Sequence, residues 1–412
     1  MANVSSSSGL EKRPKLRFPG FDEPWQTTLL SSVFAKNTQK NADGRITNVI
    51  CNSAKQGLIP QREYFDKDIA NSDNTNGYYI IEENDFVYNP RKSADAPYGP
   101  ISSYKYTEAG IVSPLYLCFR AKKEINPAFF EWYFQSPAWH RYVYMSGDSG
   151  ARHDRVSIKD DIFFAMPICL PSAHEQERIA SFLERVDQRI EKQRALVDAL
   201  KKYKRGLLSR EFGQQENGDL NNRHVGKLKD YFHLSSGSTP SSTNRAFYSG
   251  NIRWVSSGEL KPKYLCETSQ HISSEAVSSC NLREYPANTL LIAMYGLEAA
   301  GVRGTASILS VPATISQACM AIQQTGEIDI EYLYYWYIYN GQWIGIRIAQ
   351  GTKQQNLSTD TLGSLRIYAP SYSKQKKVCK LLSQIDYLIE KESQKFDLIS
   401  SVKRGLLQQI FI

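Results

Sequence analysis

The sequence predicts an α+β chain in which two different globular heads alternate with two copies of one long helix. Three observations predict this class. The segment 171–212 reappears as 370–411 without a gap, each copy carries the apolar spacing of a long packed helix, and the regions before the two copies scarcely match. Because an interval of 199 residues is far too long for a solenoid unit, we interpret the chain as a tandem pseudo-twofold repeat.

Composition and patterning divide the chain into blocks. In order, they are a disordered tail (1–15), a first head (16–170), a first long helix (171–212), a linker (213–224), a second head (225–369) and a second long helix (370–412). Short runs predict strands in the heads, at 78–82, 111–119, 289–294 and 318–322. Aromatic-rich segments predict one further helix in each head, at 128–144 and 330–348.

Each long helix carries apolar residues at alternating steps of four and three. The predicted coiled-coil seam is Ile179, Leu183, Val186, Ile190, Val197, Leu200 and Leu207 in the first copy, and Val378, Leu382, Ile385, Ile389, Phe396, Ile399 and Leu406 in the second. Polar residues interrupt it at matched places, Gln193 and Lys204 against Glu392 and Lys403. A narrow seam of this period predicts a helix packed on one partner helix. The alternative is that each helix packs only into its own head.

The overall composition sets limits on the partners and the compartment. Lys and Arg outnumber Asp and Glu to give a formal net charge of +8, which suits a polyanionic partner. The seven cysteines are odd in number and contain no C-x-x-C pair, which predicts buried thiols in a reducing compartment. With no secretory signal and no membrane-length apolar stretch, we expect a cytoplasmic protein without a membrane partner.

Loops in which Arg and Lys alternate with amides, hydroxyls and aromatic rings are the candidate nucleic-acid contacts. In the first head they are Asn89, Arg91, Lys92, Tyr98, Ser103 and Lys105, with Arg152, His153 and Arg155. In the second head they are Ser238, Thr239, Lys261, Lys263, Tyr295, Gly296, Arg303, Lys353, Gln354 and Gln355. The alternative for each residue taken alone is a solvated loop charge.

Motifs for catalysis are incomplete. Gly296 and Gly301 have P-loop spacing, but Val302 and Arg303 stand where a Lys-Ser/Thr pair is required. The run 147–150 reads Gly-Asp-Ser-Gly without the context of a serine protease, and Glu259-x-Lys261 lacks the Pro-Asp of a nuclease. The six histidines lack metal-ligand spacing. We therefore predict neither a catalytic residue nor a metal site.

A set of residues recurs with both helices. It comprises Pro171, Gln176, Ile179, Leu183, Asp187, Ile190 and the run 204–208, all present again 199 positions later except that Val378 stands for Ile179. With them come Phe18-Pro-Gly-Phe21, Trp25, Gly110-Ile-Val-Ser-Pro114, Gly237-Ser-Thr-Pro240 and Trp254. In these residues the chain resembles the specificity subunit of a type I restriction-modification system, over nearly its full length. One departure is Lys374 in the second copy, where the first copy has the family's usual Glu175.

The resemblance implies that the heads are α/β target-recognition domains and that the two conserved helical regions form an antiparallel coiled coil. It further implies a non-catalytic reader of a bipartite, asymmetric site in double-stranded DNA, with the helices as a ruler between half-sites. Two methyltransferase (M) subunits and the restriction (R) subunits would be the protein partners. S-adenosylmethionine, ATP and Mg²⁺ are expected only in those partners. The alternatives are a reader derived from a fused methyltransferase or restriction enzyme, and a coiled-coil scaffold without a DNA role.

Overall fold

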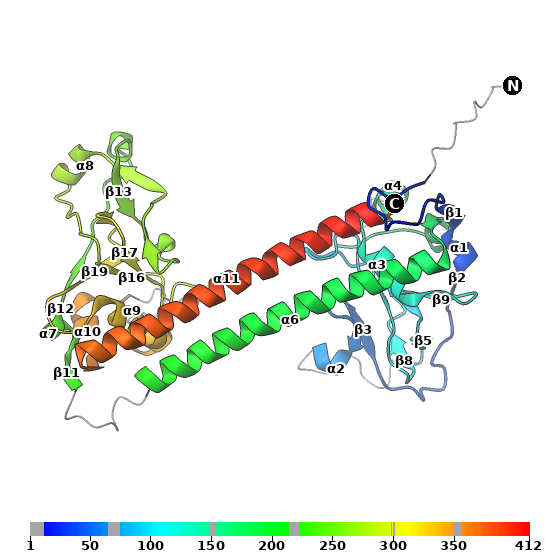
Figure 1. Ribbon diagram of the computed structural model, residues 1–412, viewed down its shortest axis with the longest axis horizontal. Coiled ribbons are helices and arrows are strands. Elements are labelled where there is room, and N and C mark those ends of the chain that lie inside the picture. The colour runs from blue at the N-terminus through cyan, green and yellow to red at the C-terminus, as the bar shows by residue number, and fades with distance from the viewer. Residues whose placement is uncertain are drawn as a thin grey trace. The chain divides into compact units, whose positions relative to one another are not determined.

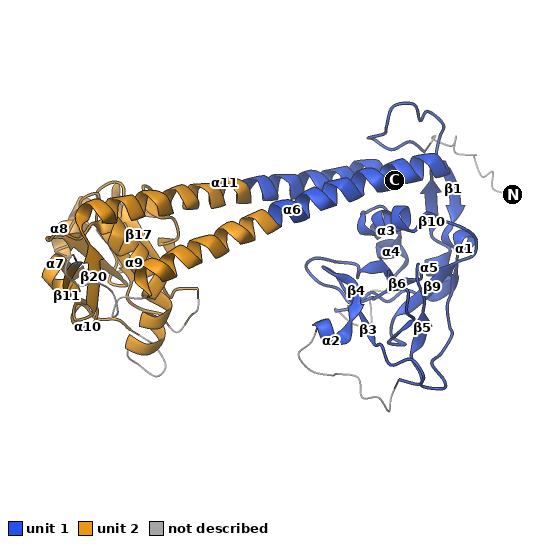
Figure 2. Cartoon of the chain, turned by 60° about the horizontal axis from the view of Figure 1, so that its bottom comes forward, with its two compact units in different colours: residues 1–194, 394–412 blue, residues 195–393 orange. Residues whose placement is uncertain are grey.

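The computed structural model describes residues 12–64, 75–147, 154–213, 223–297, 299, 301–349 and 356–412. The chain forms two compact units (Figure 2), one of residues 1–194 with 394–412 and one of residues 195–393. The sequence predicts each long helix as one separate block. In the structure both helices are instead divided between the two units, because one part of each helix packs with each head.

Unit 1 contains a short strand–turn–strand entry, a small sheet and the start of the first long helix (Figure 1). Its elements are β1 (Gln26–Leu29), α1 (Leu30–Val33), β2 (Phe34–Lys36), β3 (Ile50–Ser53), β4 (Gly57–Pro60), α2 (Gln61–Tyr64), β5 (Tyr79–Ile81), β6 (Phe86–Tyr88), β7 (Ile101–Ser103), β8 (Gly110–Val112), β9 (Leu117–Ala121), α3 (Pro127–Gln135), α4 (His140–Ser146), α5 (Asp160–Phe164), β10 (Pro167–Leu170) and α6 (Ala173–Phe212).

Unit 2 follows the same plan (Figure 1). Its elements are β11 (Arg223–Lys227), α7 (Leu228–Tyr231), β12 (Phe232–Ser236), η3 (Arg245–Tyr248), β13 (Ile252–Val255), η4 (Ser257–Glu259), β14 (Tyr264–Leu265), β15 (Gln270–Ile272), α8 (Ser274–Ser279), β16 (Leu290–Ala293), β17 (Ala306–Leu309), β18 (Thr314–Ile315), β19 (Cys319–Gln324), α9 (Ile330–Trp343), η5 (Ile344–Ile348), α10 (Thr359–Gly363), β20 (Arg366–Pro370) and α11 (Tyr372–Ile410).

The two heads share one sheet topology although their sequences scarcely match. The main sheet of unit 1 has the order β2-β9-β6-β7, and that of unit 2 has the order β12-β19-β16-β17-β14. The first four strands of both sheets pair antiparallel, and unit 2 adds β14 parallel to β17. In both units the entry strand also pairs antiparallel with the strand before the long helix, as β1 with β10 and β11 with β20.

Two predicted segments are each split in the structure. The helix expected over 128–144 is two helices, α3 and α4, and the strand expected over 111–119 is β8 and β9. Pro137 explains the first break, because the residue before a proline avoids helical backbone and Ser136 is extended at φ −81°, ψ 163°. Pro114 lies in the turn between the two strands. The second aromatic helix forms as expected, as α9 continued by η5.

A glutamine clamps the start of each long helix. Gln176 donates through Nε2 to the carbonyl of Pro171 at 3.0 Å, and Gln375 donates to the carbonyl of Pro370 at 2.8 Å. The difference between Glu175 in the first copy and Lys374 in the second has a local cause. Buried Glu175 accepts two hydrogen bonds of 2.8 Å from the guanidinium of Arg17, whereas Lys374 is exposed. The Glu175 position therefore holds the N-terminal segment of unit 1.

The predicted seam is the inward face of both helices. Among its residues none is exposed, and Leu183, Leu382 and Ile385 are fully buried or nearly so. In unit 1, Ile179 and Leu183 share a core with Leu407, Ile410 and Phe411. In unit 2, Leu208 and Phe212 share a core with Cys379 and Leu382.

Two ion pairs fix the direction of the helix pair. In unit 1 the ammonium of Lys403 binds Asp187, and in unit 2 that of Lys204 binds Asp386. Lys204 and Lys403 are equivalent positions of the repeat, and so are Asp187 and Asp386. The lysine of each copy thus binds the aspartate of the other, which requires the helices to run in opposite directions. The predicted antiparallel coiled coil is confirmed.

Three smaller expectations need correction. The predicted tail ends too late, because the carbonyl of Lys12 already accepts a hydrogen bond from Trp25 at 2.9 Å; residues 1–11 lie outside the described residues. The predicted linker also ends too late, since β11 begins at Arg223, and residues 214–222 are not described. All seven cysteines are free thiols, but Cys266 is exposed. Among the described helices, none has both the length and the apolar content needed to cross a bilayer.

The reciprocal ion pairs generate a testable prediction. Lys403→Glu places a second acid beside Asp187 and should lower the free energy of unfolding by about 1 kcal/mol, as expected for a partly exposed pair. Adding Asp187→Lys restores opposite charges and should recover most of that loss. Urea denaturation of the single and double variants measures both effects. A double variant as unstable as the two single changes combined would contradict the pairing.

Candidate nucleic-acid interface

Most of the predicted contact loops leave the same edge of the two main sheets. In unit 1, β2 and β6 end where β7 and β9 begin, because these neighbours pair antiparallel. In unit 2, β12 and β16 end where β17 and β19 begin, for the same reason. We call this the loop edge. It carries Asn89 to Lys92 in unit 1, and Ser238, Thr239, Tyr295 and Gly296 in unit 2.

The loop after the β6 or β16 strand is held in a similar way in both units. The backbone N–H of Val156 donates to the carbonyl of Pro90 at 2.9 Å, and that of Leu357 donates to the carbonyl of Met294 at 2.9 Å. In both cases the donor lies just before the short helix, α5 or α10, that precedes the exit strand. In unit 1 this contact brings Arg155 beside the loop that carries Arg91 and Lys92.

A basic cavity of about 690 Å³ opens at the loop edge of unit 1. Its cations are Lys55, Arg91, Lys92, Arg155 and Arg194, and its amides are Asn52, Gln56 and Asn89. The acid in the lining, Asp95, lies 3.5 Å from the ammonium of Lys55. The positive charge of the arginines is therefore available to a ligand, and a polyanion with hydrogen-bonding edges fits this lining.

Arg155 occupies a central place in this cavity. It also lines a neighbouring cavity of about 430 Å³, whose wall includes Leu115 and Tyr116. Its Nε is buried and meets no hydrogen-bond acceptor among the described residues, although Asp154 Oδ2 lies 4.0 Å away. An arginine nitrogen left without an acceptor costs free energy that a bound ligand could recover.

Other predicted residues of unit 1 have structural roles. Asn89 donates through Nδ2 to the carbonyl of Asn52 at 3.2 Å and accepts from the N–H of Arg91 at 3.1 Å, so it shapes the loop. Tyr98 is half-buried, and its ring centroid lies 4.6 Å from that of His140. Its ring supports the loop from inside.

The prediction for Ser103 is wrong, and Lys105 lies away from the loop edge. Ser103 is only 5% exposed and its hydroxyl donates to Glu131 at 3.0 Å. Lys105 is exposed, but it follows β7 at the opposite edge of the sheet and binds Glu131 at 3.0 Å. The segment is polar, as the sequence shows. However, strand β7 runs away from the loop edge, so Ser103 and Lys105 lie at its far end.

The loop edge of unit 2 is held by main-chain contacts. The N–H of Ser238 donates to the carbonyl of Ile315 at 3.1 Å, and the Thr239 hydroxyl accepts from the N–H of Gln317 at 3.1 Å. Gly237 makes this close approach possible, since a Cβ there would lie 2.3 Å from the Ile315 carbonyl oxygen. Arg303 donates through Nε to the carbonyl of Leu297 at 2.5 Å and so braces the Tyr295–Gly296 loop.

The two lysines predicted in unit 2 differ in their surroundings. Lys261 is exposed, as a phosphate contact requires. The prediction for Lys263 is wrong, because its side chain is only 13% exposed and its ammonium binds Glu331, Tyr335 and Ser383. Arg152, His153, Lys353, Gln354 and Gln355 lie outside the described residues.

Two motifs that could suggest catalysis have structural explanations. Glu259 accepts from the N–H groups of Ser256 at 2.8 Å and Ser269 at 2.6 Å. Burial alone would raise the pKa of Glu259, but these hydrogen bonds lower it, so the carboxylate braces a turn. Gly296 has a φ of +76° that glycine favours, which fits the predicted turn. Residues 148–150 of the Gly-Asp-Ser-Gly run are not described.

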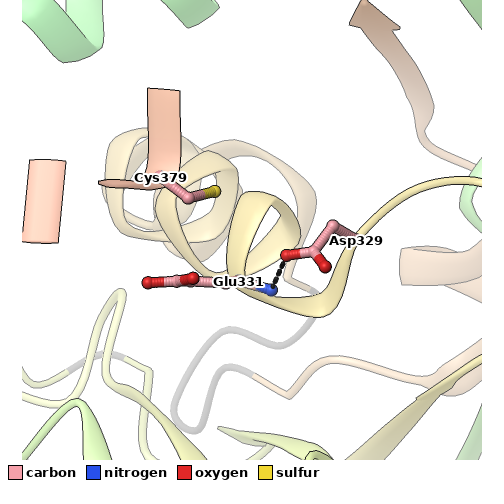
Figure 3. A group of neighbouring side chains, drawn as sticks. All are labelled: Asp329, Glu331 and Cys379. Atoms are coloured by element: carbon pink, nitrogen blue, oxygen red, sulfur yellow. Dashed lines mark hydrogen bonds between the residues drawn. The ribbon is translucent and has the colours of Figure 1, made fainter. Parts of the chain in front are cut away.

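Asp329, Glu331 and Cys379 gather where the start of α9 meets α11 (Figure 3). Three such side chains could in principle hold a metal ion. However, Glu331 already binds Lys263, and Asp329 Oδ2 lies 2.6 Å from the ammonium of Lys376. Burial raises the pKa of the Cys379 thiol, which keeps it protonated. Two carboxylates paired with ammonium groups and a neutral thiol do not form a favourable donor set for a cation.

Several cavity residues were missed from the sequence. Lys55 and Gln56 lie at the tip of the β3–β4 hairpin, where Gly57 has a φ of +70°. A polar turn between two apolar runs was a readable signal for this hairpin. Arg194 lies on α6 outside the seam, and nothing in the sequence places it beside the loop edge.

The fold is a tandem of two equivalent units, each with a head and helix segments, which defines an internally duplicated chain. A family model described as the type I restriction modification DNA specificity domain matches residues 24–200 and again residues 222–400. The two matches cover most of the chain. The protein therefore belongs to this family and carries two copies of its domain.

Individual relatives are more distant. The chain is 28% identical over 192 residues to the type I restriction enzyme MjaIX specificity subunit of Methanocaldococcus jannaschii, covering 46% of this chain and 43% of that protein. It is 26% identical over 174 residues to the EcoR124I/EcoR124II specificity subunit of Escherichia coli, covering 42% of each. The matched stretches thus span less than half the length of these relatives.

Solved structures share the fold over nearly the whole chain. A chain from a study of complex assembly and conformational transition of the type I R-M system has a TM-score of 0.63 at 16% identity, covering 95% of this chain and 98% of that one. The S subunit of a type I system from M. genitalium has a TM-score of 0.58 at 15% identity, covering 97% and 99%. At such identities the likeness supports the architecture alone.

Proposed function

We propose that the chain is the non-catalytic specificity subunit of a type I restriction-modification complex and reads a bipartite, asymmetric site in double-stranded DNA. The observation that carries this proposal is the basic cavity at the loop edge of unit 1. Exposed Arg91 and Lys92 would supply phosphate contacts, and the exposed amide of Gln56 beside them would supply a base-edge contact. Family membership supports the same function.

The difference between the loop edges supports an asymmetric site. Unit 1 presents Arg91 and Lys92 there, whereas unit 2 presents Thr239, Tyr295 and Gly296. Identical reading surfaces would select identical half-sites, because half-site arrangement mirrors protein symmetry. Two copies of one fold with different edge residues would select two different half-sites. The alternative, a scaffold without a DNA role, does not account for the basic lining of the cavity.

In this proposal S-adenosylmethionine, ATP and Mg²⁺ act only in partner subunits. The carboxylates of Asp329 and Glu331 are paired with lysines of this chain, which disfavours a Mg²⁺ site there. Cytoplasmic location remains a prediction that rests on composition and on the free cysteines. The partners that we propose are two methyltransferase subunits, joined by restriction subunits for cleavage.

Variants of the basic cavity test the DNA proposal. Arg91→Gln and Arg155→Gln should each weaken duplex binding by the full-length chain with its methyltransferase partners. If the lost contact is to phosphate, the slope of log affinity against log salt should fall by about one. If it is to a guanine edge, one base position should relax at a cost of about 1–3 kcal/mol.

Lys123→Gln is the matched control, because Lys123 is exposed in the same unit but does not line the cavity. Fluorescence anisotropy over a series of salt concentrations measures each variant. The proposal would be contradicted if both arginine variants bound duplex DNA with the affinity and salt slope of the control. Binding without salt dependence would favour the scaffold instead.

Matched features on the long helices support a partner that is present in two copies. Gly206 and Gly405 are equivalent positions inside α6 and α11, and a Cβ at either would meet nothing within 4 Å. A helix-interior glycine costs about 0.5–1 kcal/mol relative to alanine, so internal packing gives no reason for either. Exposed Tyr203 and Val402 precede them by three residues in each copy. Bare backbone beside an exposed apolar side chain suits a closely packed partner helix.

Substituting leucine for these two glycines distinguishes an effect on helix stability from an effect on methyltransferase binding. Gly206→Leu and Gly405→Leu should raise chain stability slightly, because leucine is the better helix former. Each change should also remove one methyltransferase subunit from the complex, and the double variant should remove both. Native mass spectrometry gives the stoichiometry. Lys201→Leu is the control, about 140° away around α6; a double glycine variant that still bound two partners would refute the docking site.

A further inference from the structure

Lys263 is the centre of a half-buried polar cluster that joins the head of unit 2 to the long helices. It lies just before β14, the strand that unit 2 adds to the shared sheet order. Its ammonium donates to Glu331, to the Tyr335 hydroxyl at 2.9 Å and to the Ser383 hydroxyl at 2.6 Å. A lysine ammonium has three donors, and these contacts use all of them.

The cluster continues from the head into both helices. Glu331 and Tyr335 belong to α9 of the head, whereas Ser383 belongs to α11. The Tyr335 hydroxyl in turn donates to Asp386 Oδ2 at 2.7 Å, and Asp386 binds Lys204 of α6. One unbroken line of polar contacts therefore connects the β14 segment with α9, α11 and α6.

Aromatic rings enclose the ammonium of Lys263. Its Nζ lies 4.5 Å from the ring centroid of Tyr335, 5.1 Å from that of Tyr264 and 5.7 Å from that of Tyr334. Hydrogen bonds are directional, and they are stronger in a half-buried site than in water. Together with the surrounding rings they hold the ammonium group in one position. Burial raises the pKa of Tyr264 to about 12, so its hydroxyl stays neutral.

The junctions of the two units share ring contacts and an ion pair. The Nζ of Lys403 lies 4.6 Å from the ring centroid of Trp132 in unit 1, and that of Lys204 lies 5.7 Å from the ring centroid of Tyr335 in unit 2. Each of these lysines also binds an aspartate of the opposite helix. In unit 2 the Lys263 contacts add hydrogen bonds between the head and α11, and a set of short hydrogen bonds holds one orientation.

We propose that Lys263 is a positioning residue that holds the second head in a single orientation on α11 and α6, and thereby narrows the range of half-site spacings that the chain accepts. The proposal rests on the proposed DNA function. It predicts that losing Lys263 changes spacing discrimination and leaves the base preferences of both half-sites intact.

The test uses the full-length chain with its methyltransferase partners and a random duplex library. After selection, the wild type should recover two half-sites at one dominant spacing. Lys263→Met should recover the same half-sites over several spacings, with the preference for the dominant spacing reduced by about tenfold, the equivalent of one charge-assisted hydrogen bond. Lys261→Met is the matched control, because Lys261 is the exposed lysine two residues earlier.

The control should weaken binding equally at every spacing and lower the salt slope by about one. Because Lys263→Met leaves Glu331 without its cation, the double variant Lys263→Met, Glu331→Gln keeps the test valid if the single variant unfolds. An unchanged spacing preference in a folded variant would overturn the inference, and so would a uniform loss of affinity like that of the control. If the wild type itself selected no bipartite site, the proposed DNA function would fail instead.

Discussion

The structure depends on one constraint, which is that a helix sequence must pair with its own second copy running in the opposite direction. The ion pairs Lys403 with Asp187 and Lys204 with Asp386 express this constraint, because each joins a lysine of one copy to the aspartate of the other. The apolar seam residues pack between the helices, and the charges select direction and register. In any other arrangement these partly exposed charges would lose their partners, at a cost of about 1 kcal/mol each.

The two long helices are equivalent, whereas the two heads differ in the residues of their loop edges. Both heads keep one strand order and the same pairing of entry and exit strands, which fixes the loop edge relative to each unit's own helix segments. The loop edges themselves differ, with cations and amides in unit 1 and main-chain turns with Thr239 and Tyr295 in unit 2. One shared fold thus presents two different surfaces, as the proposed reading of two unlike half-sites requires.

The apolar periodicity predicted the long helices well, because it depends only on neighbouring residues. Local polar composition indicated several loop-edge residues, because polar side chains gather in the loops that follow strands. The failures have tertiary causes. Ser103 and Lys263 are polar residues that the fold covers. Their hydrogen-bond partners, Glu131 and Glu331, are distant in sequence and could not be foreseen. Arg194 joins the basic cavity from a helix that was expected only to support. Pro137 is the exception, since its break of the aromatic helix was readable from the sequence.

The central claim is that two different heads on equivalent supports define one asymmetric DNA site. Methylome sequencing of cells with and without this chain, in the presence of its methyltransferase partner, tests it most directly. The account predicts an adenine-methylation motif with two unlike half-sites at fixed separation, present only when the chain is expressed. A palindromic motif, or a methylation pattern that does not change with the chain, would contradict it.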